Sequence, residues 1–486
     1  MKGASADAPG ASSSKVLPLA MLAEAVAALK AAGKRVVHCR GRFDLLNTGH
    51  IHRLEAARKE GDALVVTVVP DAHIQGDGPA AVFDEALRAR TVAALPAVNH
   101  VAIEQHPAAQ EAIRLIQPDV CVDGADGDPT PPKPVEAGGT SHSPEAISFL
   151  RDFRREWTPE RVIDSLASLK RLKALVVGDT VIDEYHFVRP YGMPLKAPII
   201  AAQFLTGEAH AGGVLAVANH LAGLVGEVHL VTNLGAQDSR EAFIRQHLRS
   251  NVAPRFFLHP DAPTTIKRRY LRKFLVQKLF EVSFFNDQPL PRDLEVEVLR
   301  HVSGVIENYD LVVVADFGQG FVTRNMIEVL CRQSRFLAVN AQMNSINLGY
   351  HVITRYPRAD YVCIDEEETR LACRDRTSPV PELLEQLQGE LDCRLITVTR
   401  GHHGSLTYLP GRGMVTVPVL SREVVDTIGA GDAYLAMTAP CACAGLPPEL
   451  IGFIGNAAGA IAVRILGNQQ PVAPEILFDL IRNLLR

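Results

Sequence analysis

The run from Val424 to Tyr434 constrains the fold more than any other part of the chain. It reads VVDTIGAGDAY, with two β-branched apolar residues ahead of a glycine pair and a helical pattern after it. Glycines at the start of a helix let backbone N–H groups approach an anion, and the helix dipole favours negative charge there. Asp432 follows the second glycine directly, where a carboxylate is placed to act as a general base. The run therefore predicts a phosphate-binding turn beside a base, which is the minimum that a phosphotransferase requires.

This run resembles the second signature of the PfkB, or ribokinase-like, carbohydrate kinases, whose pattern is Asp-Thr-x-Gly-Ala-Gly-Asp. All fixed positions of the pattern are matched. The resemblance implies that Asp432 is the catalytic base. It also implies that the N–H groups of Gly429, Ala430 and Gly431 bind the transferred phosphoryl group. The alternative is an ordinary glycine-rich strand-to-helix turn with an aspartate near the helix start.

The length of 486 residues exceeds one ordinary hydrophobic core, so we expect two or three domains. The net charge of −5 and the lack of a long basic run argue against nucleic acid as a partner. No apolar segment approaches a membrane span, so no membrane partner is expected. Residues 1–15 are rich in Gly, Ala and Ser, without the apolar core of a signal peptide, and predict a disordered tail. We therefore expect a cytoplasmic globular protein.

Residues 16–150 alternate strand and helix patterns, which predicts a small Rossmann-like domain with a parallel sheet. After the first expected strand the chain reads GRFDLLNTGH over residues 41–50. This loop resembles that of the cytidylyltransferase-like nucleotidyltransferases, Gly-x-Phe-Asp-x-x-His-x-Gly-His. The positions of the nucleotidyltransferase-like site are Phe43, Asp44, Asn47, Gly49 and His50.

The N-terminal domain departs from that family at positions that bind phosphate. Asn47 replaces the first histidine of the pattern, and an amide lacks the positive charge of an imidazolium. The lysines and arginine that relatives carry in two later stretches are also missing, at 75–79 (QGDGP) and 123–126 (DGAD). Two interpretations stay open: a domain that has lost nucleotidyl transfer and serves as a scaffold or binding module, or one that transfers a nucleotide with altered machinery.

From residue 172 to residue 486 the chain resembles the PfkB kinases throughout, and specifically the heptose-phosphate kinase half of bacterial bifunctional ADP-heptose synthases. In those enzymes the kinase usually precedes the nucleotidyltransferase, whereas here the order is reversed. Helical patterns over 151–171 predict linker helices between the domains. The resemblance implies a ribokinase-like three-layer α/β/α domain. It also implies a small β-lid from 185–205 and 264–285 that covers the sugar, and a homodimer formed through this lid. The basic cluster Lys267-Arg268-Arg269 of this lid is placed to hold a substrate phosphate, and a solvated strand face is the alternative.

The resemblance implies which residues bind the sugar. Asp183 follows the opening strand, and a carboxylate can accept two hydrogen bonds from a diol; a turn or helix-capping aspartate is the alternative. Gly212 and Gly213 would let the backbone approach the sugar. The asparagine of the family falls at Ala216, so Asn219 is a nearby substitute.

Asp316 ends another buried strand and is the last expected substrate-binding residue. Gln319 and Gln342 stand where the heptose kinases carry lysines. Amides still bind a sugar but attract a phosphomonoester less strongly. These positions predict a different, less anionic sugar or polyol as the acceptor.

The nucleotide side follows from the same resemblance. Thr399, Gly401 and Gly404 form a Thr-x-Gly-x-x-Gly turn after a strand that matches the nucleotide-binding strand of the family. Thr427 belongs to the run described first, and Asn456 belongs to a helix of small residues that would pack near adenine. The resemblance therefore assigns these five residues to ATP.

A metal site is implied at Glu368, which matches the glutamate of the Asn-x-x-Glu pattern that orders Mg²⁺ and its waters. Asp365 replaces the asparagine. Carboxylates suit Mg²⁺ held through water. An acidic helix N-terminus without a metal is the alternative for both residues.

We expect an ATP-dependent, Mg²⁺-assisted kinase that acts on a hydroxyl of a heptose-like sugar or sugar phosphate, with a nucleotidyltransferase-like domain that has lost its activity. The first alternative is a bifunctional kinase and nucleotidyltransferase that makes a nucleotide-activated heptose. The second is a non-catalytic binding or scaffold protein on decayed domains, which the residues at Asn47, Ala216, Gln319 and Gln342 favour.

Overall fold

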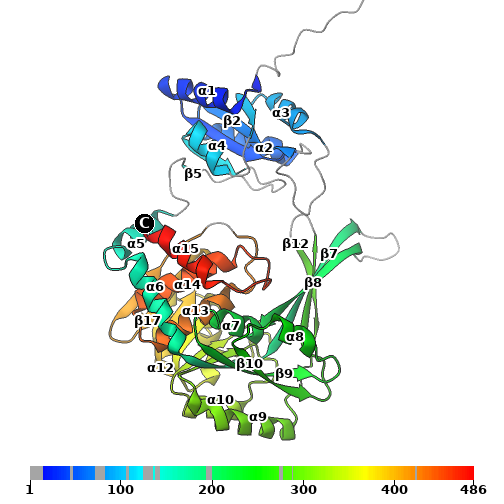
Figure 1. Cartoon of the computed structure of the whole chain (residues 1–486), viewed down its shortest axis with the longest axis vertical. Helices are drawn as coiled ribbons and strands as arrows, with labels where there is room; N and C mark the ends of the chain where they lie inside the picture. The colour runs from blue at the N-terminus through cyan, green and yellow to red at the C-terminus, as the bar shows by residue number, and fades with distance from the viewer. Residues whose placement is uncertain are drawn as a thin grey trace, which may run out of the picture. The chain divides into compact units, whose positions relative to one another are not determined.

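The computed structural model describes residues 15–43, 48–71, 83–104, 109–123, 135–136, 143–192, 200–272, 277–286, 288–421 and 424–486. The chain divides into two compact units, Met1–Ser141 and His142–Arg486, which are described separately (Figure 1). No helix in these described ranges is long and apolar enough to cross a membrane. The expected tail lies outside the described residues except for Lys15.

The first unit is built on one mostly parallel sheet. Its elements are α1 (Leu19–Ala31), β1 (Val36–Gly41), α2 (Thr48–Lys59), β2 (Ala63–Val68), α3 (Glu85–Ala93), β3 (His100–Ile103), α4 (Ala109–Ile116), β4 (Val120–Asp123) and β5 (Val135–Glu136). The strand order is β3-β2-β1-β4-β5, with only β5 antiparallel to its neighbour. Val36 and Val37 belong to different core clusters, because successive strand residues face opposite sides of a sheet. The expected Rossmann-like sheet is confirmed.

The second unit contains two sheets and the helices around them. Its helices are α5 (Pro144–Phe153), α6 (Pro159–Ala167), α7 (Val214–Leu221), α8 (Glu241–His247), α9 (Arg292–Val305), α10 (Arg324–Gln333), α11 (Glu366–Cys373), α12 (Val380–Glu390), α13 (Ala430–Cys443), α14 (Pro448–Ala462) and α15 (Pro474–Leu485). Its strands are β6 (Lys173–Gly178), β7 (Thr180–Gly192), β8 (Ala201–Gly213), β9 (Glu227–Gly235), β10 (Val252–His259), β11 (Ile266–Arg272), β12 (Gln277–Phe284), β13 (Leu311–Asp316), β14 (Leu337–Ala341), β15 (Arg358–Asp365), β16 (Asp392–Thr399), β17 (Ser405–Leu409) and β18 (Gly413–Val417).

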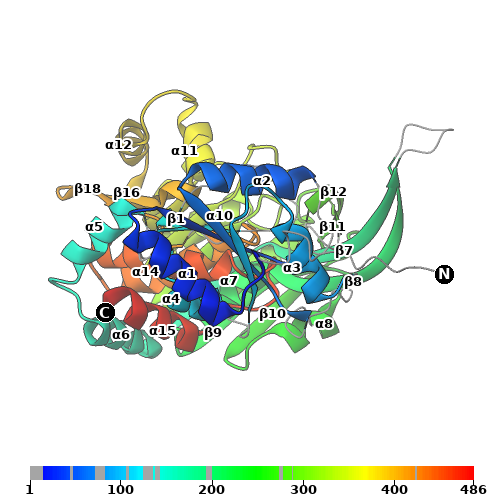
Figure 2. The ribbon, with the colours of Figure 1, turned by 90° about the horizontal axis from the view of Figure 1, so that it is seen from above.

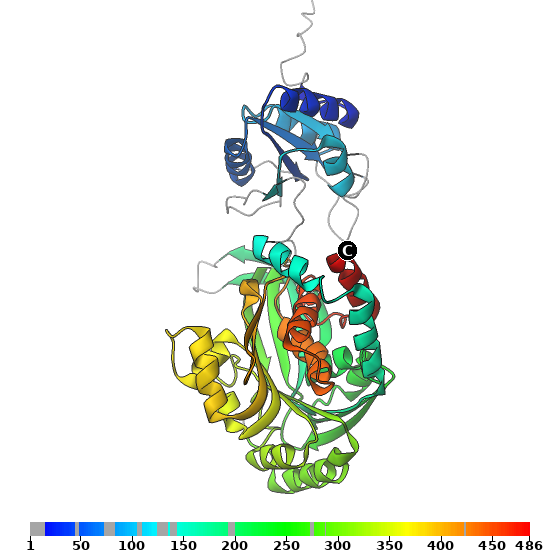
Figure 3. The ribbon, with the colours of Figure 1, turned by 90° about the vertical axis from the view of Figure 1, so that its left-hand side faces the viewer.

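The larger sheet has the order β10-β9-β6-β13-β14-β15-β16-β17-β18, and its first seven strands are parallel. Alternate residues of its central strands belong to two separate cores: Val313 packs with α13 and α14, and Val312 packs with α10 and α12. Figure 3 shows the orange α13–α14 pair and the yellow α11–α12 pair on opposite sides of this sheet. Strands buried on both faces require helices on both faces. The expected three-layer α/β/α arrangement is confirmed.

Helix α5 belongs to the second unit rather than to the first domain or to a linker. Ser143 caps it by accepting a hydrogen bond from the Ala146 N–H, and Phe153 stacks on Phe453 of α14 with ring centroids 4.5 Å apart. The guanidinium of Arg154 donates to the carbonyl of Leu484 at 2.7 Å. The units therefore divide at residue 141, earlier than the expected boundary at 150, because the buried face of α5 completes the core beneath α14 and α15.

The smaller sheet, with the order β12-β11-β7-β8, is the lid. Strand β6 ends at Gly178 and β7 begins at Thr180, so only Asp179 separates the larger sheet from the lid. Figure 2 shows β7 and β8 running together away from the helices of the second unit. One face of the lid carries Asp183 opposite Lys267, which lie side by side in the parallel pairing of β7 and β11.

Candidate active site

The N-terminus of α13 forms the centre of the site. Gly429 precedes the helix with φ of +80°, a left-handed conformation that residues with a side chain rarely adopt. A β-carbon on Gly429 would lie 2.2 Å from the Asn468 side-chain oxygen, whereas one on Gly431 would meet nothing within 4 Å. The first turn of the helix thus borders open space at Gly431, while the Ala430 N–H donates a hydrogen bond to the Thr427 carbonyl at 3.3 Å. This geometry suits an anion.

Asp432 lies in the first turn of α13 and is 7% exposed. Burial and the neighbouring Asp183 carboxylate raise the pKa of Asp432 to about 7, and the Lys267 ammonium opposes this rise. Among the described residues, none donates a hydrogen bond to this carboxylate. Asp432 is therefore a buried base that remains available to accept a proton near neutral pH.

Lys267 is the cation that faces this base from the lid. It is 7% exposed, and burial together with Arg269 lowers its pKa, while the carboxylates of Glu281, Asp183 and Asp432 act in the opposite direction. In the described part of the chain Lys267 forms no ion pair, whereas Arg269 does. Its ammonium is thus left available to an anionic or hydroxyl group of a ligand.

Asp183 is held from both sides. It accepts hydrogen bonds from the Arg269 guanidinium at 2.5 Å and from the Asn468 amide at 3.0 Å. A β-carbon on Gly212 would lie 2.1 Å from the Asp183 carboxylate, and Gly213 has φ of +56°. Gly212 therefore makes room for this carboxylate, whereas a β-carbon on Gly213 would meet the Asp179 carbonyl and the Val181 side chain. The structure brings the two expected glycines and Asp183 together, and Asn468 links them to Gly429.

Glu368 and Asp365 form a capping box at the start of α11. Glu368 accepts the Asp365 N–H at 2.8 Å and the Met343 N–H at 2.9 Å, and Asp365 accepts the Glu368 N–H at 2.7 Å. Burial and the negative charges of Asp365 and Asp432 raise the pKa of Glu368. No group of three or more His, Cys, Asp or Glu side chains in the described ranges is placed to bind a metal ion directly.

Three of the expected nucleotide residues, Thr399, Gly404 and Asn456, lie around the start of β17. Thr399 ends β16 opposite Ser405, and a β-carbon on Gly404 would lie 2.1 Å from the Val417 carbonyl oxygen. Asn456 donates to the Ser405 hydroxyl at 2.7 Å. Gly401, with φ of +52°, begins the exposed turn Gly401–His403. Thr427 is exposed in the loop before α13.

Two expected substrate residues make other contacts. The Asn219 amide donates to the His247 carbonyl at 2.8 Å and accepts the Arg249 N–H at 3.0 Å, so it ties α7 to the segment after α8. Asp316 accepts hydrogen bonds from the Tyr356 hydroxyl at 2.8 Å and the Gly318 N–H at 2.9 Å. Both side chains are buried in contacts that support the fold.

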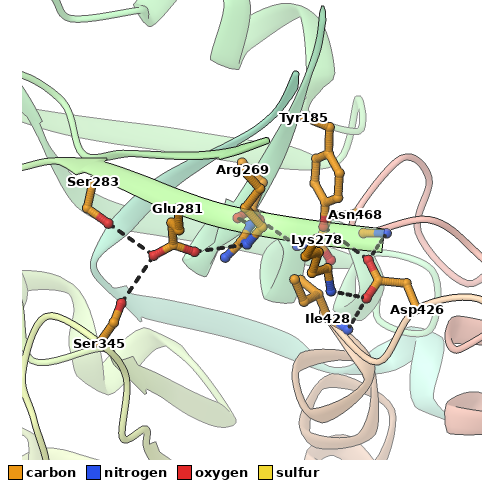
Figure 4. A network of polar contacts seen from close by, with 11 residues as sticks. Tyr185, Arg269, Lys278, Glu281, Ser283, Ser345, Asp426, Ile428 and Asn468 are labelled. Atoms are coloured by element: carbon orange, nitrogen blue, oxygen red, sulfur yellow. Dashed lines mark hydrogen bonds and ion pairs between the residues drawn. The ribbon is translucent and has the colours of Figure 1, made fainter. Parts of the chain in front are cut away.

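Several residues of the site escaped the sequence-based reasoning. They are Tyr185, Lys278, Asp426 and Asn468, which Figure 4 shows in one polar network. Lys267 and Arg269 belong to the basic cluster expected in the lid, and both are buried rather than on a solvated strand face, since alternate residues of a strand share one face. Asn468 lies in a loop and carried no pattern.

The described part of the nucleotidyltransferase-like site is small. Gly49 and His50 lie in α2, and the buried His50 ring approaches Phe43 edge-on at 5.8 Å. Asp44 and Asn47 lie outside the described residues. An unexpected buried polar chain crosses the sheet nearby: His38 bonds to Thr67 at 2.9 Å, and Thr67 donates to Glu104 at 2.9 Å.

Family models match both parts of the chain. Residues 171–475 match the pfkB family carbohydrate kinase model, and residues 38–138 match the cytidylyltransferase-like model. The relatives include the bifunctional protein HldE of Azotobacter vinelandii, 26% identical over 315 residues, and that of Pseudomonas syringae pv. tomato, 28% identical over 320 residues. Each alignment covers 64% of this chain and 64% of the relative, so the chain spans less than two thirds of the length of these proteins.

Solved structures share the fold of the second unit. Phosphofructokinase-2 from Escherichia coli in complex with substrates and products is 14% identical, with a TM-score of 0.53 over 65% of this chain and 100% of that chain. Its tetrameric inhibited form matches over the same shares, at 14% identity, with a TM-score of 0.52. At such identity the likeness shows the fold alone. The expected resemblances, to the PfkB kinases and to the bifunctional heptose proteins, are confirmed. Because the carbohydrate kinase model covers more than half of it, the chain belongs to the pfkB family of carbohydrate kinases, with a cytidylyltransferase-like region ahead of the kinase domain.

Proposed function

We propose that the second unit is an ATP-dependent kinase that phosphorylates a hydroxyl of a heptose-like sugar or sugar phosphate. The observation that carries this proposal is the convergence of Asp432, Asp183 and Lys267 at the N-terminus of α13, beside the open space in front of Gly431. A base, a carboxylate for a diol and a cation are thereby placed around one anion-binding helix end.

The chemistry follows from these positions. When bound, ATP supplies the γ-phosphoryl group and Mg²⁺ offsets charge on the departing ADP. Asp432 accepts the proton of the acceptor hydroxyl. The oxygen of that hydroxyl bonds to the γ-phosphorus as the bond between this phosphorus and the departing ADP oxygen breaks. The N–H groups of Gly429, Ala430 and Gly431 stabilise negative charge on the transferred group. Lys267 adds a positive charge beside the same centre.

The acceptor class rests on Asp183 and on the relatives. Asp183 keeps acceptor capacity because its two described partners leave lone pairs on a carboxylate that has about four. The relatives named HldE support a heptose-like acceptor. Gln319 stands where the heptose kinases carry a lysine, and both polar atoms of its amide have no hydrogen-bond partner among the described residues. A neutral amide at this position favours a less anionic acceptor.

The residues present fit a hydrated Mg²⁺. Asp365, Glu368 and Asp432 place several negative charges in mutual range, which raises the pKa of Glu368, and a cation would relieve this repulsion. The oxygens of Glu368 already accept two N–H groups. We therefore assign Glu368 to the ion through water rather than by direct coordination.

For the first unit we propose a scaffold or binding role without nucleotidyl transfer. Asn47 stands where the family carries a histidine, and Asp123 stands where relatives carry a lysine. Both differences support this proposal. The relatives named bifunctional keep the alternative open, in which both activities yield a nucleotide-activated heptose.

Replacing Asp432 by Asn removes the proposed base and changes little else in volume. We expect kcat to fall about 100- to 10,000-fold, with nucleotide affinity retained, because the amide cannot take the proton. The assay measures ADP formation with a panel of heptose and hexose phosphates. Asp479→Asn on the exposed face of α15 is the matched control. An Asp432→Asn enzyme that turns over as fast as the wild type would refute the assignment.

The pH dependence tests the environment of the same base. Because Asp432 must be ionised and its pKa is about 7, kcat/KM should fall as pH drops below about 7. Lys267→Met removes the cation that opposes the rise in this pKa, so the acid limb should move to higher pH, and Lys267→Arg should leave it in place. Asp183 and Glu368 are the acidic neighbours that remain in both variants. An acid limb at the same pH in the wild type, Lys267→Met and Lys267→Arg would refute the role of Lys267 in setting this pKa.

Nucleotidyl transfer is tested by pyrophosphate release. We expect none above background when the full chain is incubated with ATP or CTP, Mg²⁺ and a sugar 1-phosphate. If pyrophosphate appears and His50→Ala abolishes it, the bifunctional alternative replaces our proposal for the first unit. Kinase activity measured on the same preparation shows that the protein is folded.

A homodimer through the lid is supported by the outer face of β12. Phe280, Val282 and Phe284 are 45%, 39% and 39% exposed and alternate along the strand, so they share one face. We expect light scattering to give twice the chain mass of 52.8 kDa, and Val282→Asp to give the monomer. Val296→Asp, on the exposed face of α9, should leave the dimer intact. A monomeric wild type would contradict the interface.

A further inference from the structure

Asp426 is a buried carboxylate at the entrance of the loop that leads into α13. It is 4% exposed. Three of its described hydrogen-bond donors are labelled in Figure 4: the Lys278 ammonium at 2.6 Å, the Tyr185 hydroxyl at 3.1 Å and the Ile428 N–H at 3.2 Å. A fourth is the Gly467 N–H at 3.0 Å. The mechanism proposed above does not use any of these contacts.

The donors come from three parts of the second unit: the lid, the loop before α13, and the segment between α14 and α15 that contains Gly467. Lys278 lies on β12 and Tyr185 on β7, so both belong to the lid. Ile428 belongs to the loop itself and is followed directly by Gly429. Asp426 thus joins the lid on one side to the backbone of the anion-binding loop on the other. A displaced lid would withdraw the ammonium and the hydroxyl together.

Tyr185 is suited to a permanent donor role. Burial and the nearby carboxylates of Asp183 and Asp426 raise the pKa of its phenol, so it stays protonated at neutral pH. The ring also packs in a small apolar cluster with Phe187 and Leu271 of the lid, and Ile428 is packed against this cluster. The lid and the loop therefore meet through apolar contact as well as through Asp426.

A second chain of contacts links the acceptor side to the same loop. Arg269 pairs with Asp183 at 2.5 Å and with Glu281 at 2.9 Å, and Glu281 accepts the Ser345 hydroxyl at 3.1 Å. Asp183 accepts the Asn468 amide, and Asn468 lies against Gly429. The carboxylate assigned to the acceptor is therefore connected to the lid and to the loop at once.

The Asp426 carboxylate is buried, whereas the Lys278 side chain is 38% exposed, so removing the ammonium leaves a buried negative charge with neutral donors only. We propose that Lys278 and Tyr185 are positioning residues: through Asp426 they couple the place of the lid to the anion-binding conformation of the Gly429–Gly431 loop. An acceptor held under the lid then raises the affinity for the nucleotide, and the nucleotide raises that for the acceptor by the same factor. The identity of both ligands rests on the proposed function, while the coupling of lid and loop does not.

Hydrogen exchange of the full-length protein without ligands tests the coupling. In Lys278→Met we expect the amides of residues 426–432 to exchange at least tenfold faster than in the wild type, with α14 unchanged. Tyr185→Phe, which removes a single hydroxyl, should give a smaller change in the same residues. Lys278→Arg should restore slow exchange because it keeps a charged donor. Lys173→Met is the matched control, since it breaks an exposed pair with Glu227 at the opposite end of β6.

Binding of a non-hydrolysable ATP analogue with Mg²⁺, measured by calorimetry, is the second arm. We expect Lys278→Met to weaken binding at least tenfold and to weaken ADP binding less, because the loop is assigned to the terminal phosphate. Unchanged exchange at residues 426–432, or equal acceleration throughout the second unit, would overturn the positioning role. A wild type that binds no nucleotide would refute the proposed function, and the exchange result would still decide the coupling.

Discussion

The second unit has to accommodate several buried carboxylates around the N-terminus of α13. A buried charge is tolerated only where it is paired or hydrogen-bonded. Asp183 is paired with Arg269, and Asp426 with Lys278. Asp432 is the exception, because no described group donates a hydrogen bond to it and its pKa rises to about 7. Arg269 and Lys278 thus pair with the neighbouring carboxylates, and Asp432 is left able to accept a proton.

The site is assembled from two sheets rather than from one. The larger sheet and α13 provide Asp432, the proposed base, and the N–H groups proposed to bind an anion, while the lid provides Asp183, Lys267 and Arg269. Under the proposed function neither part is sufficient alone, because Asp432 needs an acceptor hydroxyl and the carboxylate assigned to that acceptor, Asp183, lies on β7 of the lid. This division explains why contacts between lid and loop, such as Lys278 with Asp426, matter for the arrangement of the whole site.

The sequence predicted the parts of the site that depend on local backbone rules. The run Gly429-Ala430-Gly431-Asp432 predicted both the turn at Gly429 and the position of Asp432 in the first turn of the helix, and the structure has both. Buried apolar strands likewise predicted the parallel sheets. Partners from distant segments were not predictable in this way. Lys278 reaches Asp426 across 148 residues, and Asn468 reaches Asp183 across 285, so no spacing along the chain records either contact.

The helical pattern over 151–171 is a second case in which the sequence predicts an element but not its packing. A helical pattern between two domains predicts a connection, yet only tertiary packing shows that Phe153 stacks on Phe453 and joins the kinase core. Asn219 was chosen because it stood near an expected asparagine in the sequence. Its amide instead supports the backbone near Arg249, which depends on a segment that no local pattern links to α7.

The central claim is that one buried aspartate faces a phosphoryl group held by the start of α13. Its most direct measurement is a crystal structure of the full chain with Mg²⁺ and a non-hydrolysable ATP analogue. The account predicts the terminal phosphate within hydrogen-bond distance of the N–H groups of residues 429–431, with the Asp432 carboxylate directed at it. A pocket closed by side chains, or a nucleotide whose terminal phosphate lies away from Asp432, would contradict the account.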